Sequence, residues 1–273
     1  AVAFDEDTLP FAVFNPHGHE VETWVEMESF HAIRDAGIVD ESGSVVPSQP
    51  VANEAIVMGE RRLGFMARVP ALGWRVYRIK PGTKTGGEPL PATDTCLENE
   101  FWRLTVDPDR GCIASLVDKA TGENVFTGPA AVPTVYEDTS DTWSHDVVGW
   151  DQPLAVFGGG ESRLIEAGPL RCRLLLKSRW QDAEVTQVFT LYRGVRRIDV
   201  RVEVDWRGHN KLLKLRFPVN AREPVATWEI PGGIITRATA GQEEPMGRWV
   251  DASSGARGLT ILNDGKHGGD VRG

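Results

Sequence analysis

The stretch RIDVRVEVDW, residues 197–206, decides the fold class of this chain. Apolar and charged side chains alternate along it. The apolar positions are Ile198, Val200, Val202, Val204 and Trp206, and the charged positions between them are Asp199, Arg201, Glu203 and Asp205. Because successive side chains of a strand point to opposite faces, this period of two predicts an antiparallel β-strand with one buried face and one solvated face.

The same period recurs on either side of this stretch. VETWVEM (21–27) alternates in the same way, and residues 184–206 predict a long hairpin with a tight turn at 193–194. Further strands are predicted in 99–125, where DPDRG and KATGE supply the turns, and in 211–220 and 256–264. The best helix candidate, 24–36, has mixed apolar spacing, so we expect a loop there with at most one helical turn. The chain is therefore predicted to be all-β and sandwich-like.

A change of composition divides the chain. KPGTKTGGEPLPATD (80–94) is rich in proline and glycine and has no apolar period, which predicts a linker. We therefore expect two domains, a small β-sandwich over residues 1–85 and a larger β-domain over residues 86–273.

Composition excludes several classes of partner. The formal net charge of -9 argues against nucleic acid, which requires a basic face. No apolar run approaches the roughly 20 residues that span a bilayer, and the first residues do not resemble a signal peptide. The three cysteines, Cys96, Cys112 and Cys172, are widely spaced and predict free thiols. We expect no nucleic-acid or membrane partner and a reducing, cytoplasmic location.

Familiar catalytic and metal-binding motifs are missing. The chain has no GxSxG, HExxH, Walker or GxGxxG pattern in a suitable context. FGGGES (157–162) predicts a hairpin turn rather than a phosphate loop, because no helical pattern follows it. His17 and His19 could share a face in a zinc site, but Asn15-Pro16 and Gly18 favour a turn between two strands. No metal ligand or cofactor is predicted in this chain.

The most unusual stretch is VYEDTSDTWSHDVVGWDQP, residues 135–153. It brings together acids, two indoles and one imidazole without any period, namely Asp138, Asp141, Asp146, Asp151, Trp143, Trp150 and His145. Exposed rings stack on the apolar face of a pyranose, and carboxylates accept hydrogen bonds from its hydroxyl groups. The composition fits equally well a long loop whose indoles fold onto the sandwich as a lid.

Several long segments resemble family 38 glycoside hydrolases, the α-mannosidases. They are LENEFWRLTVDPDRGCIASLVDKATGENV, VYEDTSDTWSHDV, YRGVRRIDVRVEVDWRGHNKLLKLRFPVN, ATWEIPGG and RWVDASSGARGLTILNDGKHGGDVRG, and they occur in the family's order. The resemblance covers about 95–273 and extends more weakly to FAVFNPHGHEVETWVEME (11–28). One departure is Gly247, which stands where relatives often have a histidine before the RWxD signature.

The resemblance implies a modular parent protein. Its fold would be a small β-sandwich domain followed by a galactose mutarotase-like supersandwich, truncated here at its C-terminal end. In the family an α/β barrel carries the nucleophile, the acid/base and most zinc ligands. A retaining glycosidase also needs two carboxyl groups about 5–5.5 Å apart. We therefore expect no catalytic residue and no zinc in this chain, which alone would be inactive, and the catalytic α/β domain of the same enzyme as its partner.

The resemblance also suggests where substrate would bind. The segment NDGKHGGDVRG (263–273) is expected to face the barrel, with Lys266, His267, Asp270 and Arg272 near the α-mannoside sugar and with Trp143 and Asp146 at the same rim. The expected role is a support for the barrel and one wall of the mannoside-binding site. The alternatives are a free-standing carbohydrate-binding module and a mutarotase-like epimerase, and the latter is disfavoured because its His/Glu constellation is missing. Exposed sheet edges predict a homodimer.

Overall fold

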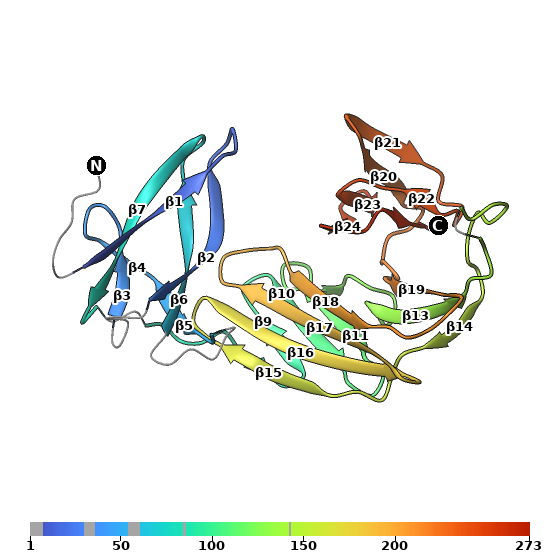
Figure 1. Ribbon diagram of the computed structural model, residues 1–273, viewed down its shortest axis with the longest axis horizontal. Coiled ribbons are helices and arrows are strands. Elements are labelled where there is room, and N and C mark those ends of the chain that lie inside the picture. Colours follow the sequence, from blue (N-terminus) through green and yellow to red (C-terminus); the bar gives the residue numbers. More distant parts are fainter. Residues whose placement is uncertain (1–7, 30–35, 54–60, 84–85, 142) are drawn as a thin grey trace. The chain divides into compact units, whose positions relative to one another are not determined.

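The computed structural model describes residues 8–29, 36–53, 61–83, 86–141 and 143–273 of the chain (Figure 1). Every regular element in these ranges is a β-strand. The all-β prediction is therefore confirmed. No helix in the described ranges is long and apolar enough to cross a membrane.

The chain forms two compact units. The first unit contains residues 1–92, 164–173 and 190–197, and the second unit contains residues 93–163, 174–189 and 198–273. Two segments from the second half of the sequence thus belong to the first unit. The division of the sequence into domains at residue 85 stays a prediction.

The first unit is built on two antiparallel sheets. One has the order β1-β7-β3-β4 and the other β2-β6-β5. Their bounds are β1 (Leu9–Asn15), β2 (Val21–Ser29), β3 (Ala36–Val39), β4 (Val45–Val46), β5 (Ser48–Val51), β6 (Arg61–Val69) and β7 (Gly73–Pro81). The core between them contains Ile38, Phe65, Tyr77 and Ile79, and the rings of Phe65 and Tyr77 meet edge-on at 4.8 Å.

The expectation of a loop or helical turn in 24–36 is wrong where the structure describes this range. Strand β2 continues to Ser29, and Trp24 pairs with Met66 of β6. A Cβ atom at Gly64 would lie 2.0 Å from the Trp24 ring, so the glycine leaves room for the indole on the sheet. The large ring that disturbed the apolar spacing is thus accommodated within a strand. Residues 30–35 of the candidate lie outside the described residues.

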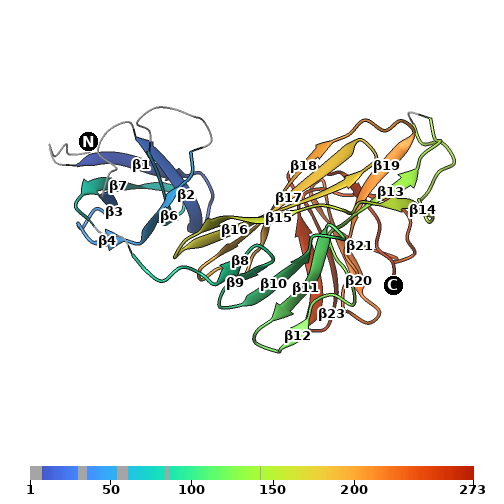
Figure 2. The ribbon, with the colours of Figure 1, turned by 90° about the horizontal axis from the view of Figure 1, so that it is seen from below.

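The second unit contains most of the remaining strands. A five-stranded sheet has the order β12-β11-β10-β9-β8, and β10, β11 and β12 are seen as neighbours in Figure 2. Its strands are β8 (Ala92–Thr93), β9 (Cys96–Glu98), β10 (Trp102–Asp107), β11 (Cys112–Asp118) and β12 (Glu123–Asn124). Gly111 and Gly122 close the two predicted turns with φ of 62° and 74°, values that favour glycine.

Two further sheets have the orders β14-β13-β19 and β15-β16-β17-β18. Their bounds are β13 (Val132–Glu137), β14 (Pro153–Val156), β15 (Ser162–Ala167), β16 (Arg171–Trp180), β17 (Ala183–Tyr192), β18 (Asp199–Asp205) and β19 (Lys211–Arg216). Strands β17 and β18 are neighbours, and Gly194 turns between them with φ of 74°, as the predicted hairpin requires. Residues 164–173 and 190–192 of this second sheet are counted with the first unit.

The last strands form a four-stranded sheet, β21-β20-β23-β24, and a two-stranded sheet, β22-β25. Their bounds are β20 (Val225–Ile230), β21 (Gly233–Arg237), β22 (Glu244–Pro245), β23 (Trp249–Ser254), β24 (Arg257–Leu262) and β25 (Gly268–Gly269). Strands β19 and β24 confirm the predictions for 211–220 and 256–264.

Three expectations need correction. The apolar face of β18 is not buried, since Val200, Val202 and Val204 are 42%, 36% and 45% exposed. FGGGES is no hairpin turn, because β14 and β15 belong to different sheets. The predicted linker is not free chain, because Leu90 is buried and its N–H donates to the Gly168 carbonyl at 2.9 Å.

Candidate functional site

The loop after β13 is organised by Asp141. Its Oδ1 accepts the backbone N–H groups of Trp143 and His145 at 3.0 and 3.1 Å, and its Oδ2 lies 2.7 Å from His145 Nδ1. The side-chain contact with His145 is the largest cause that lowers the pKa of Asp141. Trp143 is 81% exposed, and Asp146 is exposed in a left-handed conformation with φ of 63°. This tip of the loop presents its ring and carboxylate to solvent.

The terminal segment, residues 263–273, begins with a tight turn. Asn263 Oδ1 accepts the N–H groups of Gly265 and Lys266 at 3.2 and 2.6 Å. Lys266 and His267 follow with exposed side chains. Strand β25 then pairs with β22, so the segment forms regular β-structure directly before Asp270.

A group of charged side chains, which we call the terminal charge cluster, joins this segment to other parts of the second unit. It consists of Lys214, Glu243, Asp270, Arg272 and Asp151. Lys214 Nζ lies 2.6 Å from Asp270 Oδ1 and also contacts Glu243, and Arg272 Nε lies 2.9 Å from Asp270 Oδ2. Arg272 Nη2 reaches Asp151 Oδ1 at 2.6 Å.

Burial and charge act against each other in this cluster. The side chains of Lys214 and Asp270 are only 13% and 16% exposed. Burial would raise the pKa of Asp270, but hydrogen bonds from Lys214 and Arg272 outweigh it and hold that pKa below its usual value. Burial would likewise lower the pKa of Lys214, and hydrogen bonds to Asp270 and Glu243 raise it instead. Lys214 and Asp270 therefore both keep their charges at neutral pH.

Two aromatic rings border the cluster. Lys214 Nζ lies 5.6 Å from the Trp150 ring centroid and 5.8 Å from that of Tyr136, distances at which a cation is attracted to a ring. Arg272 Nη2 also donates to the Trp150 carbonyl oxygen at 3.2 Å. The loop between β13 and β14, which we call the acidic loop, thus contacts the terminal segment. The contact is made by Trp150 and Asp151, and not by the predicted Trp143 and Asp146.

The candidate residues divide into two groups. Asp270 and Arg272 lie together in the cluster. Within the described ranges, no hydrogen bond or ion pair joins the side chains of Trp143, Asp146, Lys266 or His267 to it. Sequence reasoning missed Lys214 and Glu243. Lys214 stands among leucines in KLLKLR, and a lysine on a strand next to apolar neighbours is a signal for a buried ion pair.

A second charged group lies within the first unit. Arg171 is 5% exposed and contacts Glu26 at 2.7 Å and Glu166 at 2.8 Å, and its guanidinium carbon lies 4.3 Å from the Trp24 ring centroid. Gln49 accepts the Arg171 N–H at 2.9 Å. Because these groups are buried and satisfied by one another, they serve the packing of the unit and not ligand binding.

Metal binding has little geometric support in the part of the chain that the structure describes. No group of three or more His, Cys, Asp or Glu side chains is placed to hold an ion there. His17 and His19 lie in the turn between β1 and β2, as predicted, with their rings stacked at 5.5 Å.

Comparison with known proteins identifies the class to which this β-sandwich chain belongs. The family described as "Glycosyl hydrolases family 38 C-terminal domain" matches residues 97–273. The chain therefore belongs to glycosyl hydrolase family 38, and this part of it is the family's C-terminal domain.

The relatives are longer proteins. Alpha-mannosidase 2C1 of Mus musculus is 30% identical over 192 residues, which cover 65% of this chain and 18% of that protein. Alpha-mannosidase G of Dictyostelium discoideum is 27% identical over 194 residues, 64% of this chain and 18% of that protein. The chain spans less than a fifth of the length of these two relatives.

Solved structures share the fold. A family 38 protein from Enterococcus faecalis superposes with a TM-score of 0.77 at 17% identity, covering 98% of this chain and 40% of that one. An alpha-mannosidase from Enterococcus faecalis V583 gives a TM-score of 0.76 at 15% identity, covering 98% and 38%. At such identities the likeness concerns the fold alone.

Proposed function

We propose that this chain is the non-catalytic C-terminal β region of a retaining α-mannosidase, in which it supports the catalytic barrel and forms one wall of the mannoside-binding site. The observation that carries the proposal is the family match over residues 97–273, together with relatives named alpha-mannosidases that are much longer than the chain. The partner is the zinc-binding catalytic α/β domain of the same enzyme, and the location is the cytoplasm, in keeping with three free cysteines.

The two groups of candidate residues take different roles in this proposal. Lys266 and His267 are exposed donors and would reach substrate hydroxyl groups directly, and Trp143 with Asp146 would do so from the loop. Asp270 and Arg272 are engaged with Lys214 and Asp151, so they would position the terminal segment. A rigid support of this kind keeps binding side chains in place.

The test uses the complete gene product that contains this chain. Lys266→Ala and His267→Ala are each expected to lower kcat/KM for a chromogenic α-mannoside about tenfold, equivalent to about 1.4 kcal/mol of transition-state stabilisation. Asp270→Ala is expected to lower kcat/KM by a similar factor, because without its ion pairs the terminal segment would no longer be held in position. Asp264→Ala, an exposed acid in the same turn, is the matched control and should match the wild type. Values within twofold of the wild type for all three variants would refute the proposed wall.

A free-standing carbohydrate-binding module is the second candidate, and the exposure of Trp143 beside Asp141 and Asp146 favours it. The two candidates differ in what the chain does alone. A module would bind methyl α-mannoside without any other domain, with the affinity of the complete protein. The α-mannosidase proposal expects neither turnover nor comparable binding by the chain alone.

We also propose that the sequence divides into domains at residues 85–86 and that exposed sheet edges allow two copies to pair. The support for pairing is β18, an edge strand whose three valines are exposed.

A further inference from the structure

The sheet β21-β20-β23-β24 has two unlike faces. One face is apolar and covered: Ala226 and Trp228 are almost fully buried, and a Cβ atom at Gly269 would lie only 3.9 Å from the Trp228 ring. The terminal segment therefore packs on this face. The opposite face carries Thr227, Asp251 and Thr260, because neighbouring residues of a strand alternate between faces. Exposed apolar side chains lie on the same face, namely Val225, Ile234 and Leu262.

The strand register aligns these polar side chains in one row. Thr236 pairs with Thr227, Thr227 with Asp251, and Asp251 with Thr260. Residues directly opposite each other in antiparallel strands project to the same side of the sheet. With strands about 4.8 Å apart, the three positions 227, 251 and 260 span about 10 Å.

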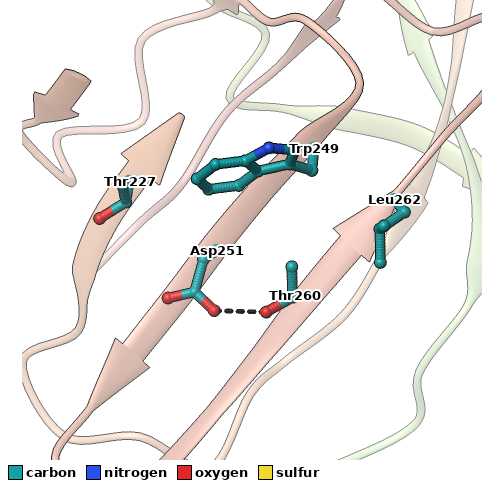
Figure 3. Close-up of a pocket in the computed structure, with 5 residues that line it drawn as sticks. All are labelled: Thr227, Trp249, Asp251, Thr260 and Leu262. Carbon is teal, nitrogen blue, oxygen red and sulfur yellow. Dashed lines mark hydrogen bonds between the residues drawn. The ribbon is translucent and has the colours of Figure 1, made fainter. Parts of the chain in front are cut away.

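An aromatic ring stands beside this row. Trp249 pairs with Leu262 one step along the sheet, and both line a hollow of about 440 Å³ with Thr227, Asp251 and Thr260 (Figure 3). Figure 3 shows the indole extending from β23 towards Thr227. The hollow is shallow and open to solvent, so it would hold a ligand by one face.

The polar groups are held in position and retain capacity for a ligand. Asp251 Oδ2 accepts the Thr260 hydroxyl at 2.6 Å, and Oδ1 accepts the Ser253 hydroxyl. Each carboxylate oxygen has a further lone pair, and the Thr260 oxygen can also accept. The Thr227 hydroxyl makes no hydrogen bond with any residue that the structure describes. No lysine or arginine lines the hollow, so nothing in its lining would attract an anion.

We propose that this face binds an uncharged pyranose sugar, with the apolar face of the sugar ring on Trp249 and its hydroxyl groups bonded to Asp251, Thr260 and Thr227. An indole beside a row of hydrogen-bonding groups matches a molecule that has one apolar face and a rim of hydroxyl groups. The site goes beyond the proposed function, because it uses none of the residues assigned there to the mannoside wall.

The experiment follows the Trp249 side chain itself. The complete gene product is labelled with 5-fluorotryptophan, and its fluorine resonances are recorded during titration with methyl α-D-mannopyranoside and methyl α-D-glucopyranoside. The Trp249 resonance, assigned by its loss in Trp249→Phe, is expected to shift with at least one of them with a millimolar dissociation constant. Acyclic xylitol, which has hydroxyl groups but no ring face, is expected to leave it unchanged.

Variants inside and outside the hollow test which side chains the sugar contacts. Thr260→Val keeps the shape of the side chain and removes its hydroxyl, and it is expected to weaken binding at least threefold. Thr236→Val lies in the same row outside the hollow, and Trp74→Ala removes an exposed indole of the first unit; both should bind as the wild type does.

Two results would overturn the proposal. One is a Trp249 resonance that no sugar shifts. The other is a sugar response that Trp143→Ala abolishes and Thr260→Val leaves intact, which would locate the sugar on the acidic loop. Neither result depends on the turnover changes of Lys266→Ala and His267→Ala, so failure here is distinguishable from failure of the proposed function.

Discussion

Asp270 forms ion pairs with two basic side chains, one through each carboxylate oxygen. Lys214 approaches Oδ1 at 2.6 Å and Arg272 approaches Oδ2 at 2.9 Å, in a place where little water reaches the carboxylate. Losing one partner of a poorly hydrated ion pair costs more than losing an exposed ion pair, although Lys214 keeps Glu243 and Arg272 keeps Asp151 as partners. Asp270 is therefore the residue at which charge contributes most clearly to the stability of the second unit.

Asp270→Asn should show this contribution through its pH dependence. The pKa of Asp270 is depressed in the folded protein, so its charge stabilises the fold above the unfolded value of about 3.9 and ceases to do so as the pH falls through the folded pKa. We expect the variant to lose about 1–2 kcal/mol in free energy of unfolding at pH about 7, and to lose less at pH about 3, which lies below the unfolded value. Urea unfolding at both pH values measures this.

Asp264→Asn, which alters an exposed acid of the same segment, is the control and should be neutral at both pH values. A loss of equal size at both values would mean that shape, not charge, accounts for the effect of Asp270→Asn.

At the scale of single residues, the sequence predicted part of this site. Asp270 and Arg272 were named as substrate-binding candidates because the terminal segment resembles family 38 sequences, and that role stays a prediction. Lys214 and Glu243 were not named, because their contacts are made with residues far away in the chain, 56 positions in the case of Lys214 and Asp270. Sequence spacing contains no information on such contacts until the strand order is known.

At the scale of elements, the connection 157–161 between β14 and β15 depends on close backbone approach. The N–H groups of Gly159 and Gly160 donate to the carbonyls of Asp109 and Pro108 at 2.8 and 3.2 Å. A Cβ atom at Gly160 would lie 1.6 Å from the Lys177 carbonyl oxygen, which is backbone and cannot move alone. The glycine run thus serves the packing of one strand connection against another.

Gly160→Ala is accordingly expected to destabilise the protein by about 1–3 kcal/mol, because either the connection or β16 must shift. Thermal unfolding of the complete protein measures the change. Gly18→Ala is the matched control, since a Cβ there meets nothing within 4 Å and the glycine has no positive φ. An unchanged midpoint for Gly160→Ala would contradict the packing described for this connection.

The sequence predicted the positions of strands and turns better than it predicted which strands pair with one another. Gly111, Gly122 and Gly194 mark turns that could be recognised from local composition, because a positive φ selects glycine. The pairing of β13 with β19, and the separation of β14 from β15 into different sheets, depend on contacts between distant segments. For this reason FGGGES was predicted as a hairpin turn when it connects two sheets.

At the scale of the whole molecule, strand β18 is the clearest place for association. Its valines alternate as a buried strand would require, yet they are exposed on an edge. Edge strands with apolar side chains and unpaired backbone groups invite pairing with another chain, and a lysine on the edge opposes it. The alternation was visible in the sequence, whereas the exposure of the valines and the edge position of β18 are seen only in the structure.

Val202→Lys should therefore weaken the pairing of two copies that we propose. We expect its apparent dissociation constant for pairing to rise at least tenfold in sedimentation equilibrium. Val225→Lys is the control, because Val225 is also an exposed valine but lies on β20, an interior strand of its sheet. Equal association of wild type and Val202→Lys would exclude this edge as the interface.

The composition of the first unit has a consequence for the order in which the protein forms during translation. The unit includes residues 164–173 and 190–197, and Arg171 supplies the positive charge that Glu26 faces. Its two N-terminal sheets leave the ribosome long before those segments are made. At about 5–20 residues per second, the interval between residues 92 and 197 lasts roughly 5–20 s. During that time the hydrophobic core between the two sheets can already form, whereas the Glu26 carboxylate and the Gln49 amide stay hydrated until Arg171 is made.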